Sequence, residues 1–133
     1  MKLHHILLFL VIFLISACTI PAKIKLYNNS GEMITARVDN EYLIIKSAEV
    51  ATFGQDYGVE FSIEKDNELF KYQLHRLALS NIEFVGWGPF TKRVFRAQFE
   101  ANGTVWAVGP EQEYPVTGYI DQPEEFPLVP KKV

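Results

Sequence analysis

The chain has 133 residues, with 13 Lys and Arg against 16 Asp and Glu and a net charge of −3. This mildly acidic balance argues against a nucleic-acid-binding protein, because such proteins need clustered positive charge to neutralise phosphates. The sequence has one cysteine, so no disulfide can form within the chain. A domain of this size must therefore be stabilised by the packing of its apolar and aromatic residues.

Residues 1–17 have the layout of a signal peptide. Lys2 precedes ten consecutive apolar residues, from Ile6 to Ile15, and two small residues follow them. A membrane-spanning helix needs about 20 apolar residues, so this run is too short to span a bilayer. It does fit the apolar region of a signal peptide. Two alternatives stay open, namely an uncleaved signal anchor and a buried N-terminal strand of a cytosolic protein.

The residues Ile15-Ser16-Ala17-Cys18 resemble the lipobox of bacterial lipoproteins, in which an aliphatic residue and two small residues precede a cysteine. The resemblance implies cleavage between Ala17 and Cys18 by lipoprotein signal peptidase, which makes Cys18 the first mature residue and the site of acylation, palmitate included. Two or more acyl chains hold a protein stably in a bilayer. The membrane is therefore an expected partner, through acylated Cys18, and residues 18–23 form a short tether. Because Thr19 is not Asp, the family's sorting rule implies the periplasmic face of the outer membrane if the cell is Gram-negative.

Residues 24–108 are expected to form an all-β domain. Val59, Phe61 and Ile63 alternate with polar residues, which is the two-residue period of a half-buried strand. A two-residue turn at Asp66-Asn67 predicts a hairpin whose inward partners are all apolar. The predicted pairs are Lys65 with Glu68, Ile63 with Phe70, Phe61 with Tyr72, and Val59 with Leu74. A slip of one residue would destroy this match.

Two further hairpins are predicted from their turn residues. Asn102-Gly103 favours a type I′ turn. The pairs expected there are Phe99 with Trp106 and Ala97 with Val108, with Arg96, Gln98 and Glu100 facing out. A turn at Asn40-Glu41 would instead align Val38 with Leu43 and Ala36 with Ile45.

The remaining segments complete the predicted fold. Strands are expected from Ile24, over Met33–Val38 after a turn at residues 28–31, and over Val50–Phe53. Residues 74–80 have helical spacing, although a strand end followed by a loop fits them equally well. About seven short strands without long helices predict a small antiparallel β-sandwich, or a partly open barrel.

Residues 109–133 form a tail of different composition, with five of the seven prolines of the chain among several acidic residues. Proline donates no backbone hydrogen bond and favours the polyproline conformation, so an extended tail that cannot join a central strand is expected. Its large apolar residues are Tyr114, Val116, Tyr119, Phe126 and Leu128. They could strap the tail across the domain, or they could be anchors for a partner.

The sequence contains no recognisable catalytic or metal site. His75 is the sole histidine after cleavage, so a Ser/His/Asp site would have to use it, and the strand pattern places it on the surface. Zinc sites need several Cys or His ligands, and residues 66–68 lack the spacing of a calcium loop. The acidic pairs Glu60 with Glu64 and Glu124 with Glu125 are interpreted as solvated charges. No cofactor, metal or small-molecule substrate is therefore expected.

The segment Ile82–Phe90 is the candidate contact site of the domain. Glycine and proline interrupt its pattern, while three large aromatic residues remain: Phe84, Trp87 and Phe90. The segment could be a loop that plugs one end of the sandwich. It could instead be an exposed loop that contacts a partner or the bilayer interface, where Trp is favoured. The basic residues Lys92, Arg93 and Arg96 follow and could meet lipid phosphates.

The sequence therefore predicts a lipid-anchored envelope protein that is not an enzyme and that binds another protein close to the membrane. An envelope assembly or accessory role is the general form of this hypothesis. An alternative is an inhibitor or exclusion lipoprotein that acts against an incoming hydrolase, toxin or phage. Lysozyme-inhibitor lipoproteins are of similar size, but they often use disulfides, which this chain cannot form. An enzyme is the third class, and it would require His75 to lie in a pocket with a second polar residue.

Overall fold

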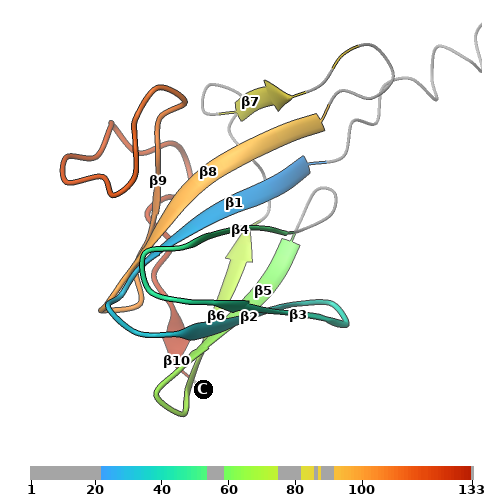
Figure 1. The fold of residues 1–133 in the computed structure, drawn as a ribbon, viewed down its shortest axis with the longest axis vertical. Coiled ribbons are helices and arrows are strands. Elements are labelled where there is room, and N and C mark those ends of the chain that lie inside the picture. The colour runs from blue at the N-terminus through green and yellow to red at the C-terminus, as the bar shows by residue number, and fades with distance from the viewer. Residues whose placement is uncertain (1–21, 54–58, 75–81, 86, 88–91, 133) are drawn as a thin grey trace, which may run out of the picture.

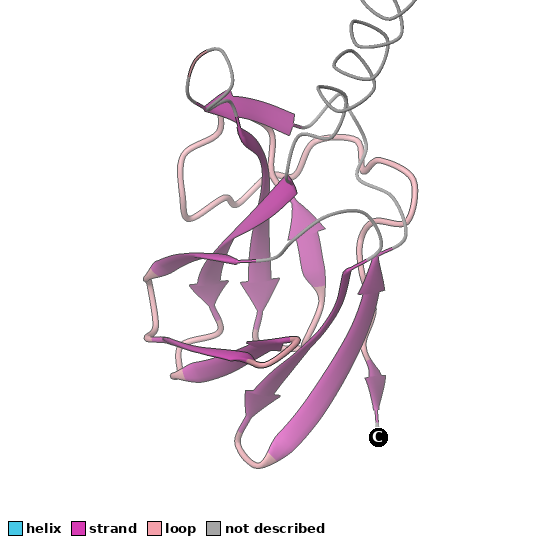
Figure 2. Ribbon diagram, turned by 90° about the vertical axis from the view of Figure 1, so that its right-hand side faces the viewer, coloured by secondary structure: helices cyan, strands magenta, loops and turns pink. Residues whose placement is uncertain are grey.

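The computed structural model describes residues 22–53, 59–74, 82–85, 87 and 92–132. Ten strands are assigned in this part of the chain, and they form two five-stranded sheets (Figures 1 and 2). The described residues contain no helix, and neither sheet closes into a barrel. The all-β prediction is confirmed, and the two sheets are arranged like a sandwich. The expected strand number is too low, because two short strands lie in the segments predicted as an aromatic loop and as the tail.

The first sheet has the order β4-β1-β8-β7, and β9 also pairs with β8. Its strands are β1 (Ala22–Asn29), β4 (Val50–Phe53), β7 (Ile82–Val85), β8 (Lys92–Glu100) and β9 (Val105–Ala107). β1 and β8 lie side by side and run parallel, from Ala22 opposite Arg93 to Asn29 opposite Glu100 (Figure 1). The expectation of a purely antiparallel domain is wrong at this pair. A parallel pair needs a long connection, and the whole of the second sheet except β10 lies between these two strands in the chain.

The second sheet has the order β10-β6-β5-β2-β3, and all of its neighbouring strands are antiparallel. Its strands are β2 (Ile34–Val38), β3 (Glu41–Ile45), β5 (Val59–Lys65), β6 (Glu68–Leu74) and β10 (Lys131–Lys132). The last strand brings the end of the described chain back to β6, where Lys131 pairs with Lys71. Two hairpins, β2–β3 and β5–β6, make up most of this sheet, and the pairing of β2 with β5 joins them.

The hydrophobic core lies between the sheets and contains the inward residues of both. Leu26 and Phe95 come from the first sheet, and Ile63 comes from the second. The rings of Phe53 in β4 and Phe61 in β5 lie 5.7 Å apart and join the two sheets directly. The inward side chains of the two sheets thus form a single hydrophobic cluster, as expected for two sheets packed face to face.

The hairpin of β5 and β6 has the predicted register in all four predicted pairs. Asp66 and Asn67 both have positive φ, 51° and 62°. A type I′ turn requires positive φ at both central residues, and Asn and Asp tolerate that conformation better than most residues. The prediction is confirmed because the turn chemistry and the apolar pattern favour the same alignment.

The hairpin of β2 and β3 turns one residue earlier than predicted. Its loop is Asp39-Asn40, so Val38 pairs with Glu41 and Ala36 pairs with Leu43. Asp39 has a φ of 52° whereas Asn40 has no positive φ, and positive φ at the first loop residue alone distinguishes a type II′ turn from a type I′ turn. The predicted alignment is therefore wrong by two residues. A shift of two residues keeps the faces of a strand unchanged, so Leu43 and Ile45 still face inward.

The hairpin of β8 and β9 has a longer loop than predicted. Glu100 N–H donates to Thr104 O at 3.0 Å, and Gly103 N–H donates to Glu100 O at 2.9 Å. Gly103 has a φ of +88°, which fits a three-residue loop with a glycine bulge rather than a type I′ turn. Phe99 therefore pairs with Val105 and not with Trp106. Because the register differs by one residue from the predicted one, Trp106 lies on the outer face of the sheet, opposite Gln98, and not on the inner face.

Candidate functional site

The predicted lipidation site, Ala17 and Cys18, lies outside the described residues, as does His75. The first described residue is Ala22, which opens β1. β1 is an inner strand of the first sheet, with β4 on one side and β8 on the other. A chain that enters the domain here is therefore attached to the middle of a sheet rather than to a loop or an edge.

The predicted aromatic segment is partly a strand, which corrects its interpretation as a loop. Ile82–Val85 is β7, which pairs with β8 so that Val85 lies opposite Lys92. Trp87 follows, and 75% of its surface is exposed. Phe90 lies outside the described residues, and the side chain of Phe84 is not described. Because β7 is antiparallel to β8 and β8 is parallel to β1, Trp87 lies near the same end of the sheet as Ala22.

The two arginines expected to meet lipid phosphates are buried. Arg93 is 6% exposed and Arg96 is 8% exposed. The Nη1 atom of Arg96 donates to Gly109 O at 2.7 Å and to Pro110 O at 3.1 Å. Arg96 does lie on the outer face of the first sheet, but residues of the tail cover it, so a role in contacting phosphates is not supported for this residue.

The tail packs over the outer face of the first sheet through two aromatic stacks. The rings of Tyr27 and Tyr114 are 4.9 Å apart and nearly parallel, and the guanidinium of Arg96 lies 4.6 Å from the Tyr114 ring. Tyr114 also donates its hydroxyl to Lys25 O at 3.0 Å. Trp106 of β9 stacks on Tyr119 at 4.6 Å. Of the two alternatives for the tail, these contacts agree with a strap across the domain.

Gln98 of β8 is the polar centre of this covered face, and it is fully buried. Its Oε1 accepts from Val116 N–H at 2.8 Å, and its Nε2 donates to Val116 O at 2.9 Å. Both backbone groups of Val116 are thus paired by a single side chain. The amide also contacts Tyr119 Oη at 2.9 Å and Glu100 Oε1 at 2.7 Å. Gln98 was expected to face solvent, and this cluster shows why it does not.

The hydroxyls of Tyr72 and Tyr119 have raised pKa values because of their surroundings in the fold. Burial raises the pKa of Tyr72, whose hydroxyl donates to Gly103 O at 2.6 Å. Burial also raises the pKa of Tyr119, and its hydrogen bond to the Glu100 carboxylate adds to the effect. Both hydroxyls therefore stay protonated at neutral pH and act as donors in the folded protein, which suits a structural role.

The tail also covers the open edge of β9. Val105 and Leu128 exchange two backbone hydrogen bonds, of 3.0 and 2.8 Å. The side chain of Gln122 pairs with both backbone groups of Ala107, at 2.8 and 3.1 Å. Phe126 adds a ring contact with Phe95 at 4.8 Å. These bonds leave no free ladder groups at Val105 and Ala107, so this edge cannot accept another strand there.

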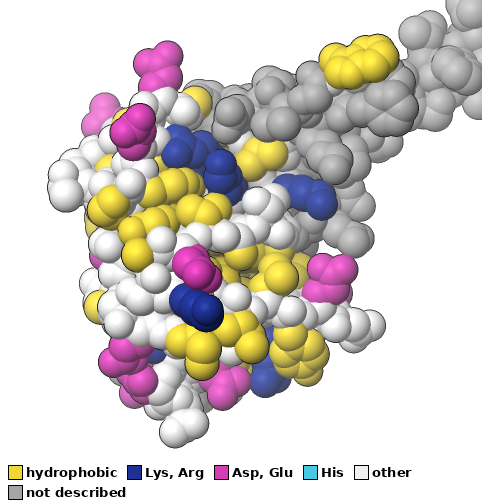
Figure 3. All heavy atoms as spheres, viewed as in Figure 1, with side chains coloured by type: hydrophobic (Ala, Val, Ile, Leu, Met, Phe, Trp, Pro, Cys, Tyr) yellow, Lys and Arg dark blue, Asp and Glu magenta, His cyan; other side chains and the backbone are white. Residues whose placement is uncertain are grey.

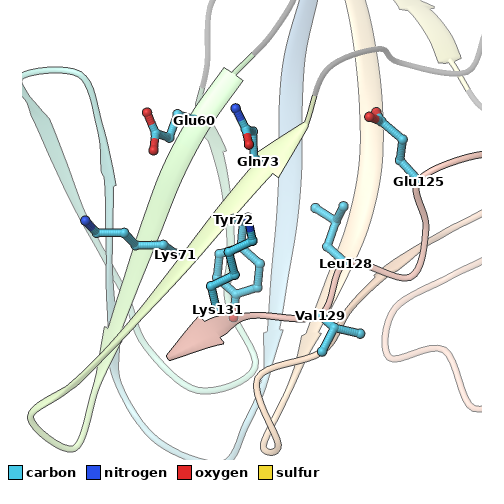
Figure 4. A pocket seen from close by; sticks show the side chains of 8 residues that line it. All are labelled: Glu60, Lys71, Tyr72, Gln73, Glu125, Leu128, Val129 and Lys131. Atoms are coloured by element: carbon cyan, nitrogen blue, oxygen red, sulfur yellow. The ribbon is translucent and has the colours of Figure 1, made fainter. Parts of the chain in front are cut away.

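The outer face of the second sheet carries two adjoining hollows, which we call the outer trough. One hollow, of about 420 Å³, lies between β6 and the tail (Figure 4). The other, of about 400 Å³, lies over β2, β3 and β5. Glu60 and Lys71 line both. The remaining charged residues of the trough are Arg37, Asp39, Glu125 and Lys131. The trough thus mixes acidic and basic groups beside the apolar Leu128 and Val129.

The described residues do not form a metal centre, since they contain no group of three His, Cys, Asp or Glu side chains that could hold an ion. The acidic pair of β5 is divided between two roles. Glu64 forms an ion pair with Arg37 at 3.1 Å, whereas Glu60 lines the outer trough. Within the described part of the chain, no helix is long and apolar enough to span a bilayer.

Comparisons with protein-family models, with curated proteins and with solved structures find no match to this chain. Sequence reasoning missed the outer trough and the Gln98 cluster, because both depend on which strands become neighbours. The one signal available was the outward polar run of β8, whose glutamine is a residue that can pair both groups of a peptide.

Proposed function

We propose that the chain is a lipid-anchored envelope lipoprotein whose β domain binds another protein close to the membrane, without catalysis of its own. One observation carries the proposal: Ile15-Ser16-Ala17-Cys18 directly follows an apolar run of signal-peptide length. In this proposal residues 1–17 are removed and Cys18 is acylated. If the cell is Gram-negative, the protein lies on the periplasmic face of the outer membrane. The two sheets then form a β-sandwich whose outer face is completed by the proline-rich tail.

The position of β1 supports a domain held close to the bilayer. Only residues 19–21 separate Cys18 from Ala22, where the strand begins. Even fully extended, the chain spans about 14 Å between those two residues. Because β1 is an inner strand, the tether ends in a rigid element, and the end of the sheet that contains Ala22 would face the headgroups. The exposed Trp87 near this end is a residue type favoured at the bilayer interface.

The outer trough supports protein binding as the task of the domain. It lies over the second sheet, where residues of the tail line one of its two hollows, and it offers charges of both signs next to apolar side chains. Such a surface suits a polar protein partner better than a small apolar ligand.

The anchor is tested by labelling the full chain with radioactive palmitate in a bacterial host. The expected result is labelling that disappears in Cys18→Ala and persists in Thr19→Ala, because only the cysteine sulfur and amine carry acyl chains. Equal labelling of the two variants would refute the anchor.

The binding role is tested by recovering the lipidated chain from envelope extract with the proteins bound to it. Glu60→Lys should lose a partner that Glu111→Lys retains, because Glu60 lines the outer trough whereas Glu111 is an exposed residue of the tail. A resident envelope protein would support an assembly role, and an incoming or secreted hydrolase would support inhibition. If both variants retain every partner, the trough is not the binding surface.

A further inference from the structure

β3 forms one outer edge of the second sheet, and its only strand partner among the described residues is β2. Natural sheets protect such edges with proline, lysine, short strands or covering segments. β10, at the opposite edge, is two residues long, follows Pro130 and consists of lysines. In the first sheet the tail covers β9. β3 has the sequence Glu41-Tyr42-Leu43-Ile44-Ile45, which contains neither proline nor lysine, and no other described strand covers its outer edge.

The face of β3 that points away from the core is apolar. Tyr42 and Ile44 lie two residues apart on this face, and they are 64% and 65% exposed. Figure 3 shows hydrophobic side chains gathered over this part of the molecule. β4, the nearby edge of the first sheet, has a single large exposed apolar side chain, that of Val50. Two adjacent exposed apolar residues on an unprotected edge strand indicate a surface that another strand covers.

The neighbouring strand holds Tyr42 in place. The guanidinium of Arg37 lies over the Tyr42 ring at 4.8 Å, and Arg37 also pairs with Glu64 at 3.1 Å. A ring held by an arginine that is itself paired with a carboxylate loses less conformational freedom when a partner packs on it, which lowers the cost of association. Tyr42 is therefore held in position before it binds.

The register of the hairpin orients the free backbone groups. A two-residue loop is closed by a hydrogen-bonded pair, here Val38 with Glu41, and such pairs alternate along an antiparallel ladder. Glu41 and Leu43 therefore direct their backbone groups toward β2. The N–H and C=O groups of Tyr42 and Ile44 point to the open edge, where an added strand would bind them.

We propose that β3 binds β3 of a second copy of this chain, antiparallel and centred on Leu43. In this register Tyr42 of each copy pairs with Ile44 of the other, and all four of these residues lie on one face. The arrangement is also complementary in charge. Asp39 and Glu41 lie at one end of the strand and Lys46 follows the other end, so an antiparallel partner sets acidic residues beside a lysine at both ends. A parallel partner would place like charges together. A single strand pair buries less area than a standard interface, so a weak dimer is expected.

The register is tested by a disulfide in the full chain. Opposed residues of a non-hydrogen-bonded antiparallel pair have Cα atoms about 4.5 Å apart, within the range that a disulfide accepts. Leu43→Cys should therefore form a covalent dimer when cells that make the chain are oxidised. Val129→Cys, an exposed position in the tail, should not. The parent chain under the same oxidant gives the background from Cys18. The absence of a dimer with Leu43→Cys, or equal amounts with Val129→Cys, would overturn the proposal.

The apolar contact is tested by sedimentation velocity of the purified full chain. Ile44→Lys should raise the dissociation constant of the dimer on the order of a hundredfold, because each dimer loses two buried isoleucine contacts. Val129→Lys, which adds the same charge at an exposed apolar residue, should leave the constant unchanged. Ile44 is exposed, so its variant is expected to fold. A parent chain that sediments as a monomer at every concentration, or two variants that weaken the dimer equally, would refute self-association through β3.

Discussion

Replacing Gln98 with Leu tests whether the covered face of the first sheet depends on one buried amide. Leucine has a similar size but no polar atoms, so the change removes both hydrogen bonds to the backbone of Val116. Val116 is itself buried, and water cannot easily replace the lost partner. Each buried group left unpaired costs about 1–3 kcal/mol. The apolar side chain recovers about 1 kcal/mol through burial, so a net loss of about 1–5 kcal/mol is expected.

The assay is urea unfolding at neutral pH, with amide hydrogen exchange at Val116 as a local measurement. Gln73→Leu is the matched control, because Gln73 is exposed on β6 and its replacement should change the free energy of unfolding by about 0.5 kcal/mol or less. Exchange at Val116 should accelerate in Gln98→Leu only. If the two variants unfold at the same urea concentration, the amide does not hold the tail, and the reasoning fails.

The remaining predictions concern the pH dependence of stability and a strained turn. Because burial raises the pKa of Tyr72 above its value of about 10 in the unfolded chain, stability is intact below pH 10 and falls by about 1.4 kcal/mol per pH unit above it. Unfolding curves between pH 9 and about 11.5 should show this slope together with a smaller contribution from Tyr119, whose pKa is also raised, and Tyr72→Phe should reduce the total slope; an unchanged slope would argue against a buried hydroxyl at residue 72. Ala48 has a φ of 63°, which is strained for a residue with a Cβ, so Ala48→Gly should raise the free energy of unfolding by about 0.5–1 kcal/mol. Ala101→Gly, in a turn without positive φ, should lower the free energy of unfolding or leave it unchanged. Equal effects of the two glycine substitutions in calorimetry would count against strain at Ala48.

The sequence alone determines the features that depend on local pattern. The alternation of Val59, Phe61 and Ile63, together with the turn at Asp66-Asn67, predicts the register of the β5–β6 hairpin, and all four predicted pairs are confirmed. This succeeds because a two-residue period and a two-residue turn each fix the register, and here they agree. The signal-like run and the lipobox are also local sequence patterns, and the proposed localisation of the protein rests on them.

Two turns show where local pattern is insufficient. Asn102-Gly103 is compatible with a two-residue or a three-residue loop, and the longer loop places the glycine of the bulge at positive φ. The choice moves Trp106 to the outer face, where it can stack on Tyr119. At Asp39-Asn40 the loop is one residue earlier than predicted, but the faces of the strand are unchanged.

Only the tertiary structure decides what covers each face and each edge. The polar residues Arg96 and Gln98 alternate with core residues, and by periodicity they belong on a solvated face. They lie on that face, yet the tail buries them, because its backbone supplies the hydrogen-bond partners that solvent would otherwise provide. Likewise, the position of β3 at an edge of its sheet cannot be read from its own residues. Periodicity fixes which side of a strand a residue occupies. Whether that residue is buried depends on segments distant in the sequence, and the local pattern does not predict which of them packs against it.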